Sequence, residues 1–174
     1  MSDASLEVLL DDFESKDKWE VAGEAADRTH VMTFKEGAPS KRPGVYADGV
    51  AGADVKAVAL LVRAATDKTE IELRAKPGRA FTITGEAEGL DLWVRSPHAA
   101  LRVSAQLTAA DGEAQELLLG LLTADRDWHR VGAALAEPIS GVTLHGLKIQ
   151  VMDVIKREGE LMILLDDLTV RTKG

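Results

Sequence analysis

The stretch GLDLWVRSPHAALRVSAQLTAADGEAQELLLG, residues 89–120, contains short runs in which apolar and polar residues alternate. Apolar side chains occupy every second position in residues 90–94 and again in residues 101–107. A period of two residues is typical of β-strands with one buried face. Ser-Pro-His at 96–98 separates the first run from the second, and Asp-Gly at 111–112 suits a tight hairpin turn that needs a positive φ. The stretch is therefore predicted to form a three-stranded β-meander.

The rest of the chain continues this pattern, with turn residues at short intervals. Residues 55–63 form an apolar run that suits a strand buried on both faces, and residues 144–154 form a longer alternating strand. Pro138 is expected to end the strand that begins at residue 127. The pattern predicts about ten strands, no helix and a single all-β domain over residues 1–174, an antiparallel β-sandwich of the jelly-roll kind. Its predicted core includes Leu92, Val94, Val103, Leu107, Ile149 and Leu165.

Composition limits the classes of partner. The 174-residue chain has a formal net charge of -8 with scattered Lys and Arg, so it should bind neither nucleic acid nor an anionic membrane surface. It has no cysteine, which excludes disulfides and thiolate metal sites. The start has neither a basic segment nor a long apolar run, so no signal peptide or membrane insertion is expected. The chain is then either cytoplasmic, if Met1 is the native start, or the mature form of an exported protein.

Acidic residues gather near both ends of the chain. Asp11, Asp12 and Glu14 follow the first apolar run, and Asp166 and Asp167 interrupt the last one. Because the first and last strands of a jelly roll usually lie side by side, Glu14 with Asp166 or Asp167 is a candidate calcium site. The alternative is that these carboxylates are solvated strand ends that protect the sheet edges. Hydrolysis of a glycosidic bond by paired carboxylates would need sugar-stacking aromatics around them, and none are nearby in the sequence.

The remaining chemistry-bearing residues favour structural roles. The histidines, at positions 30, 98, 129 and 145, show no metal-ligand spacing and are expected on strands or the surface. Trp19, Trp93 and Trp128 are expected to plug or cap the core. With a single tyrosine, Tyr46, little is left for a flat sugar-stacking surface. Weak or no binding of free sugars is therefore expected, with no cofactor other than the possible calcium.

Several motifs are similar to one family. The opening DDFES followed by Trp19, the central GLDLWV with its hairpin, the segment DWHRV and the closing ILLDDLTV resemble the spirochete flagellar filament outer layer (sheath) proteins, the FlaA family. The resemblance implies a jelly-roll sandwich without enzymatic activity, located in the periplasm and assembled on a flagellin core beside other sheath proteins. The arrangement of DDFE at the start and DD at the close also resembles galactose-binding-like and carbohydrate-binding modules. A carbohydrate-binding module of a larger extracytoplasmic protein is thus the alternative function.

Two basic loop tips are the predicted contacts with protein partners. Lys41 and Arg42 lie in the loop of residues 36–44, and Lys156 and Arg157 lie in a charged hairpin. Exposed loops on a rigid sandwich are common recognition sites. On an acidic body, basic tips of this kind would orient a subunit against a filament.

Overall fold

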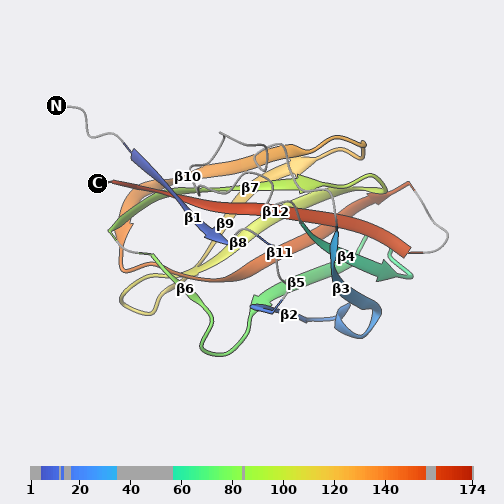
Figure 1. The fold of residues 1–174 in the computed structure, drawn as a ribbon, viewed down its shortest axis with the longest axis horizontal. Helices are drawn as coiled ribbons and strands as arrows, with labels where there is room; N and C mark the ends of the chain where they lie inside the picture. The colour runs from blue at the N-terminus through green and yellow to red at the C-terminus, as the bar shows by residue number, and fades with distance from the viewer. Residues whose placement is uncertain are drawn as a thin grey trace.

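A computed structural model of the chain describes residues 5–11, 13, 17–34, 57–83, 85–155 and 160–173. These residues form two antiparallel sheets packed face to face (Figure 1), which confirms the predicted all-β sandwich. Sheet A contains β1 (Ser5–Asp11), β3 (Thr29–Phe34), β4 (Ala57–Arg63), β7 (Glu86–Arg95), β10 (His129–Ser140) and β12 (Glu160–Lys173). Sheet B contains β2 (Trp19–Ala22), β5 (Glu70–Ala75), β6 (Phe81–Thr82), β8 (Ala99–Thr108), β9 (Ala114–Leu122) and β11 (Thr143–Val154).

The strand order brings the two ends of the chain together. Sheet A runs β10-β7-β12-β4-β3, with β1 paired to β12, and sheet B runs β2-β5-β11-β8-β9, with β6 paired to β11. First and last strands therefore lie side by side, as predicted. The only helix in the described residues is the single 3-10 turn η1 (Ala26–Arg28). None of the described helical structure is long and apolar enough to cross a membrane.

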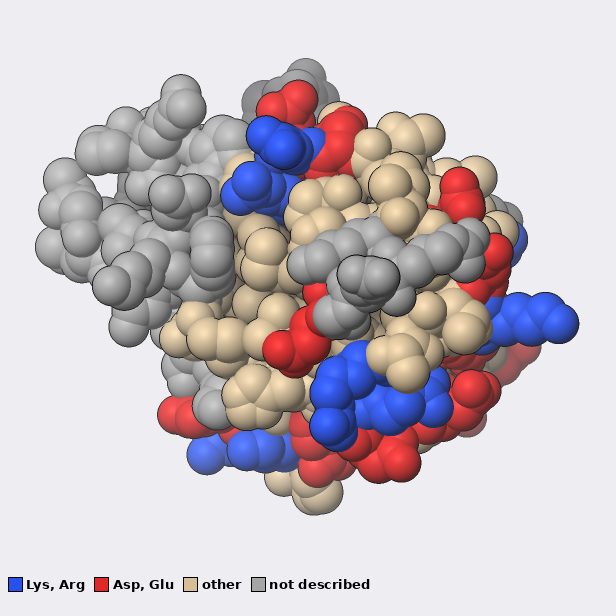
Figure 2. Space-filling model, turned by 90° about the vertical axis from the view of Figure 1, so that its right-hand side faces the viewer, with Lys and Arg blue, Asp and Glu red and all other residues tan. Residues whose placement is uncertain are grey.

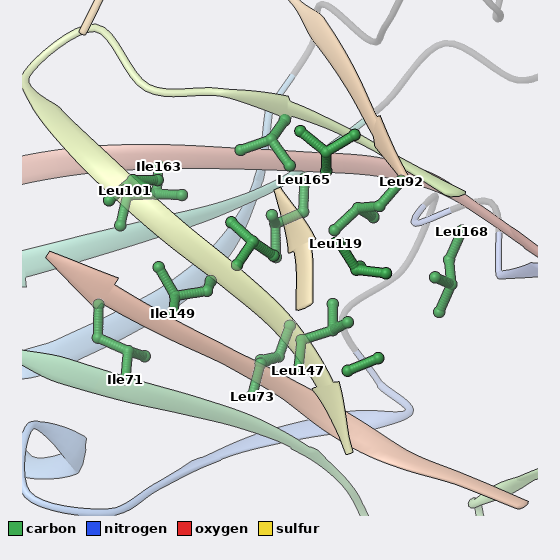
Figure 3. Close-up of a cluster of buried hydrophobic side chains, with 14 of the residues drawn as sticks. Ile71, Leu73, Leu92, Leu101, Leu119, Leu147, Ile149, Ile163, Leu165 and Leu168 are labelled. Atoms are coloured by element: carbon green, nitrogen blue, oxygen red, sulfur yellow. The ribbon is translucent and has the colours of Figure 1, made fainter. Parts of the chain in front are cut away.

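The core lies between the sheets and is built from the inward positions of the alternating strands. Figure 3 shows leucine and isoleucine side chains from both sheets meeting there. The six core residues predicted from the sequence, Leu92, Val94, Val103, Leu107, Ile149 and Leu165, are all buried. Burying each side chain of this size contributes roughly 1.5–3 kcal/mol. The core thus fixes which face of each strand is left for solvent.

The predicted three-stranded meander is wrong in one respect. β8 and β9 pair as a hairpin, and Gly112 at its turn has the expected positive φ of 86°. β7, however, belongs to sheet A, where it lies between β10 and β12. Residues 96–98 therefore carry the chain from one sheet to the other, and the Ser96 hydroxyl donates to the Ala99 carbonyl at 2.6 Å across this turn. A hairpin between β7 and β8 within one sheet would bury the same apolar face of each strand as the observed crossing between the sheets. Alternation alone therefore does not distinguish the two connections.

The prediction that Pro138 ends its strand is also wrong. β10 continues through Pro138 to Ser140. It is an edge strand of sheet A, and its register with β7 shifts between Ala134 and Ile139. Proline is tolerated on edge strands and at irregularities because no ladder hydrogen bond requires its missing N–H.

Candidate functional site

The face of sheet B that points away from the core is rich in polar side chains. Lys148 of β11 lies opposite Glu72 of β5 on one side and Ser104 of β8 on the other. One row further along, Gln150 lies opposite Glu70. These positions alternate with buried leucines and isoleucines, so packing of the core aims them outward.

Lys148 is the centre of an ion network on this face. Its Nζ lies 3.4 Å from a Glu70 carboxylate oxygen and 3.6 Å from one of Glu116 on β9. Desolvation lowers the pKa of the Lys148 ammonium, but the charges of Glu116 and Glu70 outweigh it, so this pKa is raised. The Gln150 amide donates to Glu70 at 3.2 Å. The network holds side chains of three strands in fixed positions.

A hollow of about 320 Å³ opens beside this network, over β8, β9 and β11. Gln106, Glu116 and His145 are its polar lining residues, and the hydroxyl of Thr108, which also lines it, contacts His145 Nε2. The complete lining is Gln106, Leu107, Thr108, Ala114, Gln115, Glu116 and His145. The exposed lining of the hollow is mostly apolar and includes a smaller polar part, in a space large enough for part of a small ligand.

Gly146 allows the strands beneath this face to approach closely. It lies at the register shift of β11, and a Cβ at this position would come within 2.6 Å of the Leu73 carbonyl oxygen of β5. Real Cβ atoms do not approach a backbone oxygen so closely. The small residue therefore keeps β11 paired to both neighbours below the hollow.

The apolar side chains of this face are aliphatic. Leu118 and Leu121 of β9 are 40% and 68% exposed, and Met152 of β11 is 51% exposed. Among the described residues no Trp, Tyr or Phe side chain lies on this face, because Trp19 and Phe81 of sheet B pack toward the core. The face can form hydrogen bonds and aliphatic contacts, and its described part provides no ring for stacking.

The tryptophans only partly follow the prediction. Trp19 is buried, and its ring centroid lies 5.4 Å from that of Phe13. Trp93 and Trp128 are half-buried. Trp93 projects from the outer face of sheet A because its neighbours Leu92 and Val94 point into the core. The alternation in the sequence already indicated this direction.

The predicted calcium ligands are not all among the described residues, since Glu14 lies outside them. Asp166 and Asp167 are buried, and a carboxylate oxygen of Asp166 accepts the Asp167 N–H at 2.9 Å. Asp167 also has a left-handed φ of 39°. Within the described part of the chain, no three His, Asp or Glu residues form a group that could hold a metal ion. The calcium site with Glu14 therefore stays a prediction.

Addition of calcium tests this prediction. If Glu14 and Asp167 bind the ion, a hundredfold excess over the dissociation constant should stabilise the fold by about 2.7 kcal/mol. In a chain of this size that corresponds to a melting temperature higher by roughly 5–10 °C. Asp167→Asn should abolish the shift, and magnesium serves as the control ion. Superimposable melting curves with calcium and with chelator would remove the site.

The basic residues predicted to contact partners, Lys41, Arg42, Lys156 and Arg157, lie outside the described residues. Elsewhere the charges are mixed: on the side of the molecule in Figure 2, Lys and Arg side chains lie next to Asp and Glu.

Three histidines, His30, His129 and His145, are exposed, and His129 Nε2 lies 2.7 Å from Asp125. The Asp127 backbone N–H and His129 together lower the pKa of Asp125.

Sequence reasoning missed the residues of the polar face. Lys148, Gln150, Glu70 and Glu116 belong to no motif, and each reads as an ordinary solvent-facing position. The available signal was the alternation itself, because the pattern that places Ile149 in the core also places Lys148 on the opposite face. Which strands lie next to each other, and hence which outward residues meet, required the strand order.

Comparisons with known proteins show likeness of fold. No family model matches the chain, and neither does any curated protein. Among solved structures, it resembles the xylan-binding family 22 module of a Paenibacillus barcinonensis xylanase, with 13% identity over 98% of this chain and 97% of that one (TM-score 0.54). It also resembles the family 11 carbohydrate-binding module of a Clostridium thermocellum cellulosomal cellulase, with 13% identity over 98% and 96% of the two chains (TM-score 0.52).

A further match is a Clostridium thermocellum xylanase fragment that joins a family 22 module to a catalytic module. The identity is 16% and the TM-score 0.58, over 97% of this chain but only 28% of that one. At such identities the matches define the fold class: the chain is a β-sandwich jelly roll of the kind found in carbohydrate-binding modules. The comparisons lend no support to membership of the flagellar sheath family.

Proposed function

We propose that the chain is a non-enzymatic carbohydrate-binding module that contacts a polysaccharide through the outer face of sheet B. The observation that carries the proposal is the hollow beside Gln106, Glu116 and His145, next to the ion network of Lys148. Carboxylates accept hydrogen bonds from sugar hydroxyls, and amide and imidazole groups can both donate and accept. The fold likeness to carbohydrate-binding modules agrees with this use of the sandwich.

The chemistry of the face favours a polymer over a free oligosaccharide. Its described part lacks aromatic rings, so a single sugar ring would be held by hydrogen bonds that compete with water, each contributing only about 0.5–1.5 kcal/mol net. A polysaccharide presents many equivalent positions to the same face and can be retained despite weak contacts. Because the face carries carboxylates, a neutral polysaccharide is the expected ligand class, and xylan, which the similar Paenibacillus barcinonensis module binds, is the first to test.

Glu116→Gln should raise the dissociation constant for the polysaccharide that the chain binds about tenfold. This is the effect expected from losing a charge-assisted hydrogen bond. Glu116 is half-exposed, so the variant should fold normally. The matched control is Glu86→Gln, an exposed glutamate of β7 in sheet A, which should bind like the unmodified chain. Affinity electrophoresis against a panel of neutral polysaccharides measures the effect.

If the chain binds none of these polysaccharides, the proposal is contradicted. Equal weakening by Glu86→Gln would place the binding surface elsewhere than in the hollow.

A second candidate function follows from the sequence resemblance: a structural protein of the periplasmic flagellar sheath that binds the flagellin core and neighbouring sheath subunits. The aliphatic side chains on the outer face of sheet B favour it, because exposed Leu121 and Leu118 suit protein contacts better than sugar rings. Cosedimentation with flagellin core filaments distinguishes the two. Cosedimentation without polysaccharide retention supports the sheath function, and the reverse result supports the carbohydrate-binding module.

A further inference from the structure

Three Lys and Arg side chains project from the described strands of sheet B onto its outer face, and two of them have carboxylate partners. Lys148 of β11 is the centre of the ion network, and the Arg74 guanidinium on β5 lies 2.9 Å from a carboxylate oxygen of Glu72. The third is Arg102 of β8, which is exposed and forms neither an ion pair nor a side-chain hydrogen bond with any described residue. Its charge is therefore available to a ligand.

The neighbours of Arg102 do not neutralise it. In the sheet register it lies between Leu121 of β9 and Gln150 of β11, which are both uncharged. Asp153 lies opposite Ala100, one row further along β8, and forms no ion pair with Arg102. A guanidinium can bind a carboxylate through two parallel hydrogen bonds. This position therefore favours a ligand that brings a carboxylate of its own.

Arg102 and the hollow lie on the same row of outward residues. Gln106 and Thr108, which line the hollow, are outward residues of β8 further along the strand. At about 3.3 Å per residue, the Cα atoms of Arg102 and Gln106 are separated by about 13 Å. Because β8 ends at Thr108, the face continues along this strand from the hollow only toward Arg102. A polymer that occupies the hollow and runs along β8 therefore reaches Arg102.

The surface between the hollow and Arg102 contains no unpaired charge among the described residues. Ser104, the intervening outward residue of β8, is 3% exposed, since it lies opposite Leu118 of β9 and Lys148 of β11. The ion pair of Lys148 with Glu116 spans β8 at this point. A ligand chain would lie over an aliphatic side chain and over charges that are already paired. Neither repels a polymer with acidic groups as strongly as an unpaired carboxylate would.

We propose that Arg102 binds a carboxylate of the polysaccharide, so that the ligand is a neutral main chain with spaced uronic acid side groups. This inference rests on the proposed function, because the hollow must hold the main chain. Glu116 disfavours an acidic sugar in the hollow, whereas Arg102, about 13 Å further along β8, binds one through charge-assisted hydrogen bonds. Arg102 thus discriminates between polymers that share a main chain and differ in their acidic side groups.

Two forms of one polymer test the inference: a xylan that carries glucuronic acid side groups, and the same xylan after reduction of its carboxyl groups to primary alcohols. Isothermal titration calorimetry measures the two dissociation constants. The unmodified chain should bind the acidic form about tenfold more tightly at low salt, the effect of one charge-assisted contact. Because the guanidinium is exposed, this preference should decrease as the ionic strength rises.

Variants of Arg102 assign the preference to its side chain. In Arg102→Gln the ratio of the two dissociation constants should fall to about one, because the charge is lost. Arg102→Lys keeps the charge without the planar guanidinium and should retain a preference of about threefold. The matched control is Arg63→Gln, since Arg63 is an exposed arginine of β4 in sheet A, and it should keep the full preference.

Equal affinity of the unmodified chain for the two forms would overturn the inference and leave the proposed function intact, because the main chain would still be bound. A preference that persists unchanged in Arg102→Gln would also overturn it, since the carboxylate would then be bound elsewhere. Binding of neither form would remove the inference together with xylan as the ligand of the hollow.

Discussion

Replacing Leu92 by alanine should lower the free energy of unfolding by about 2–5 kcal/mol, the range for large-to-small substitutions in a closed core. Leu92 is fully buried in the middle of β7. β7 lies between β10 and β12 in sheet A, so neighbouring strands restrict collapse of the backbone around the new cavity. The loss combines the lost transfer free energy of the side chain with the cost of the cavity that remains.

Urea unfolding, monitored by fluorescence, measures this loss. An unchanged slope of the free energy of unfolding against urea concentration would show that the unfolded state is the same. Met152→Ala is the control. Met152 is an aliphatic side chain of β11 that is half-exposed, so its truncation should change stability by no more than about 0.5 kcal/mol. A loss at Leu92 as small as that of the control would show that its side chain does not belong to the core.

The direction of Leu92 could be predicted because it depends on local alternation alone. The same is true of Val103, Ile149 and Leu165, which are buried as expected. The partner of β7 could not be predicted in this way. A hairpin of β7 with β8 and a crossing to the opposite sheet bury the same side chains, and the choice depends on the packing of β12 and β10 against β7.

The candidate site could be predicted from local alternation even less than the partner of β7. Glu70, Glu116 and Lys148 lie far apart in the sequence and meet only because β5, β11, β8 and β9 are neighbours in that order. Outward polar residues on strands carry no spacing signal, since nearly every solvent-facing position looks alike. By contrast, the contact of the first strand with the last was predictable from the architecture, and β1 pairs with β12 as expected.

Asp11 is the second residue whose loss should have a large effect. It lies at the end of β1 in sheet A, is almost fully buried, and accepts the indole N–H of Trp19 at the start of β2 in sheet B. It also accepts the N–H of Phe13 at 3.2 Å. Phe13 has a φ of 51°, a left-handed conformation that is unfavourable for an aromatic residue. One carboxylate thus links the two sheets and holds a strained turn.

Asp11→Ala should therefore lower the free energy of unfolding by about 2–4 kcal/mol. The substitution removes a buried charge, which by itself would favour folding, but it leaves two buried donors without this acceptor. Two unsatisfied donors cost more than the relieved charge, because the Asp11 carboxylate is already compensated by its hydrogen bonds and by Lys18 at 4.0 Å. Asp11→Asn keeps one acceptor oxygen and should lose about half as much.

The urea midpoint, read from the fluorescence of the tryptophans, compares these variants with Asp127→Ala. Asp127 is an exposed aspartate between β9 and β10, and its removal should change stability by less than about 0.5 kcal/mol. Lys18→Ala should also cost little, because Lys18 is half-exposed and its ion pair is long. If Lys18→Ala were as destabilising as Asp11→Ala, the ion pair rather than the two hydrogen bonds would hold the first strand against Trp19. If Asp11→Ala were neutral, the relief of the buried charge would outweigh both lost bonds.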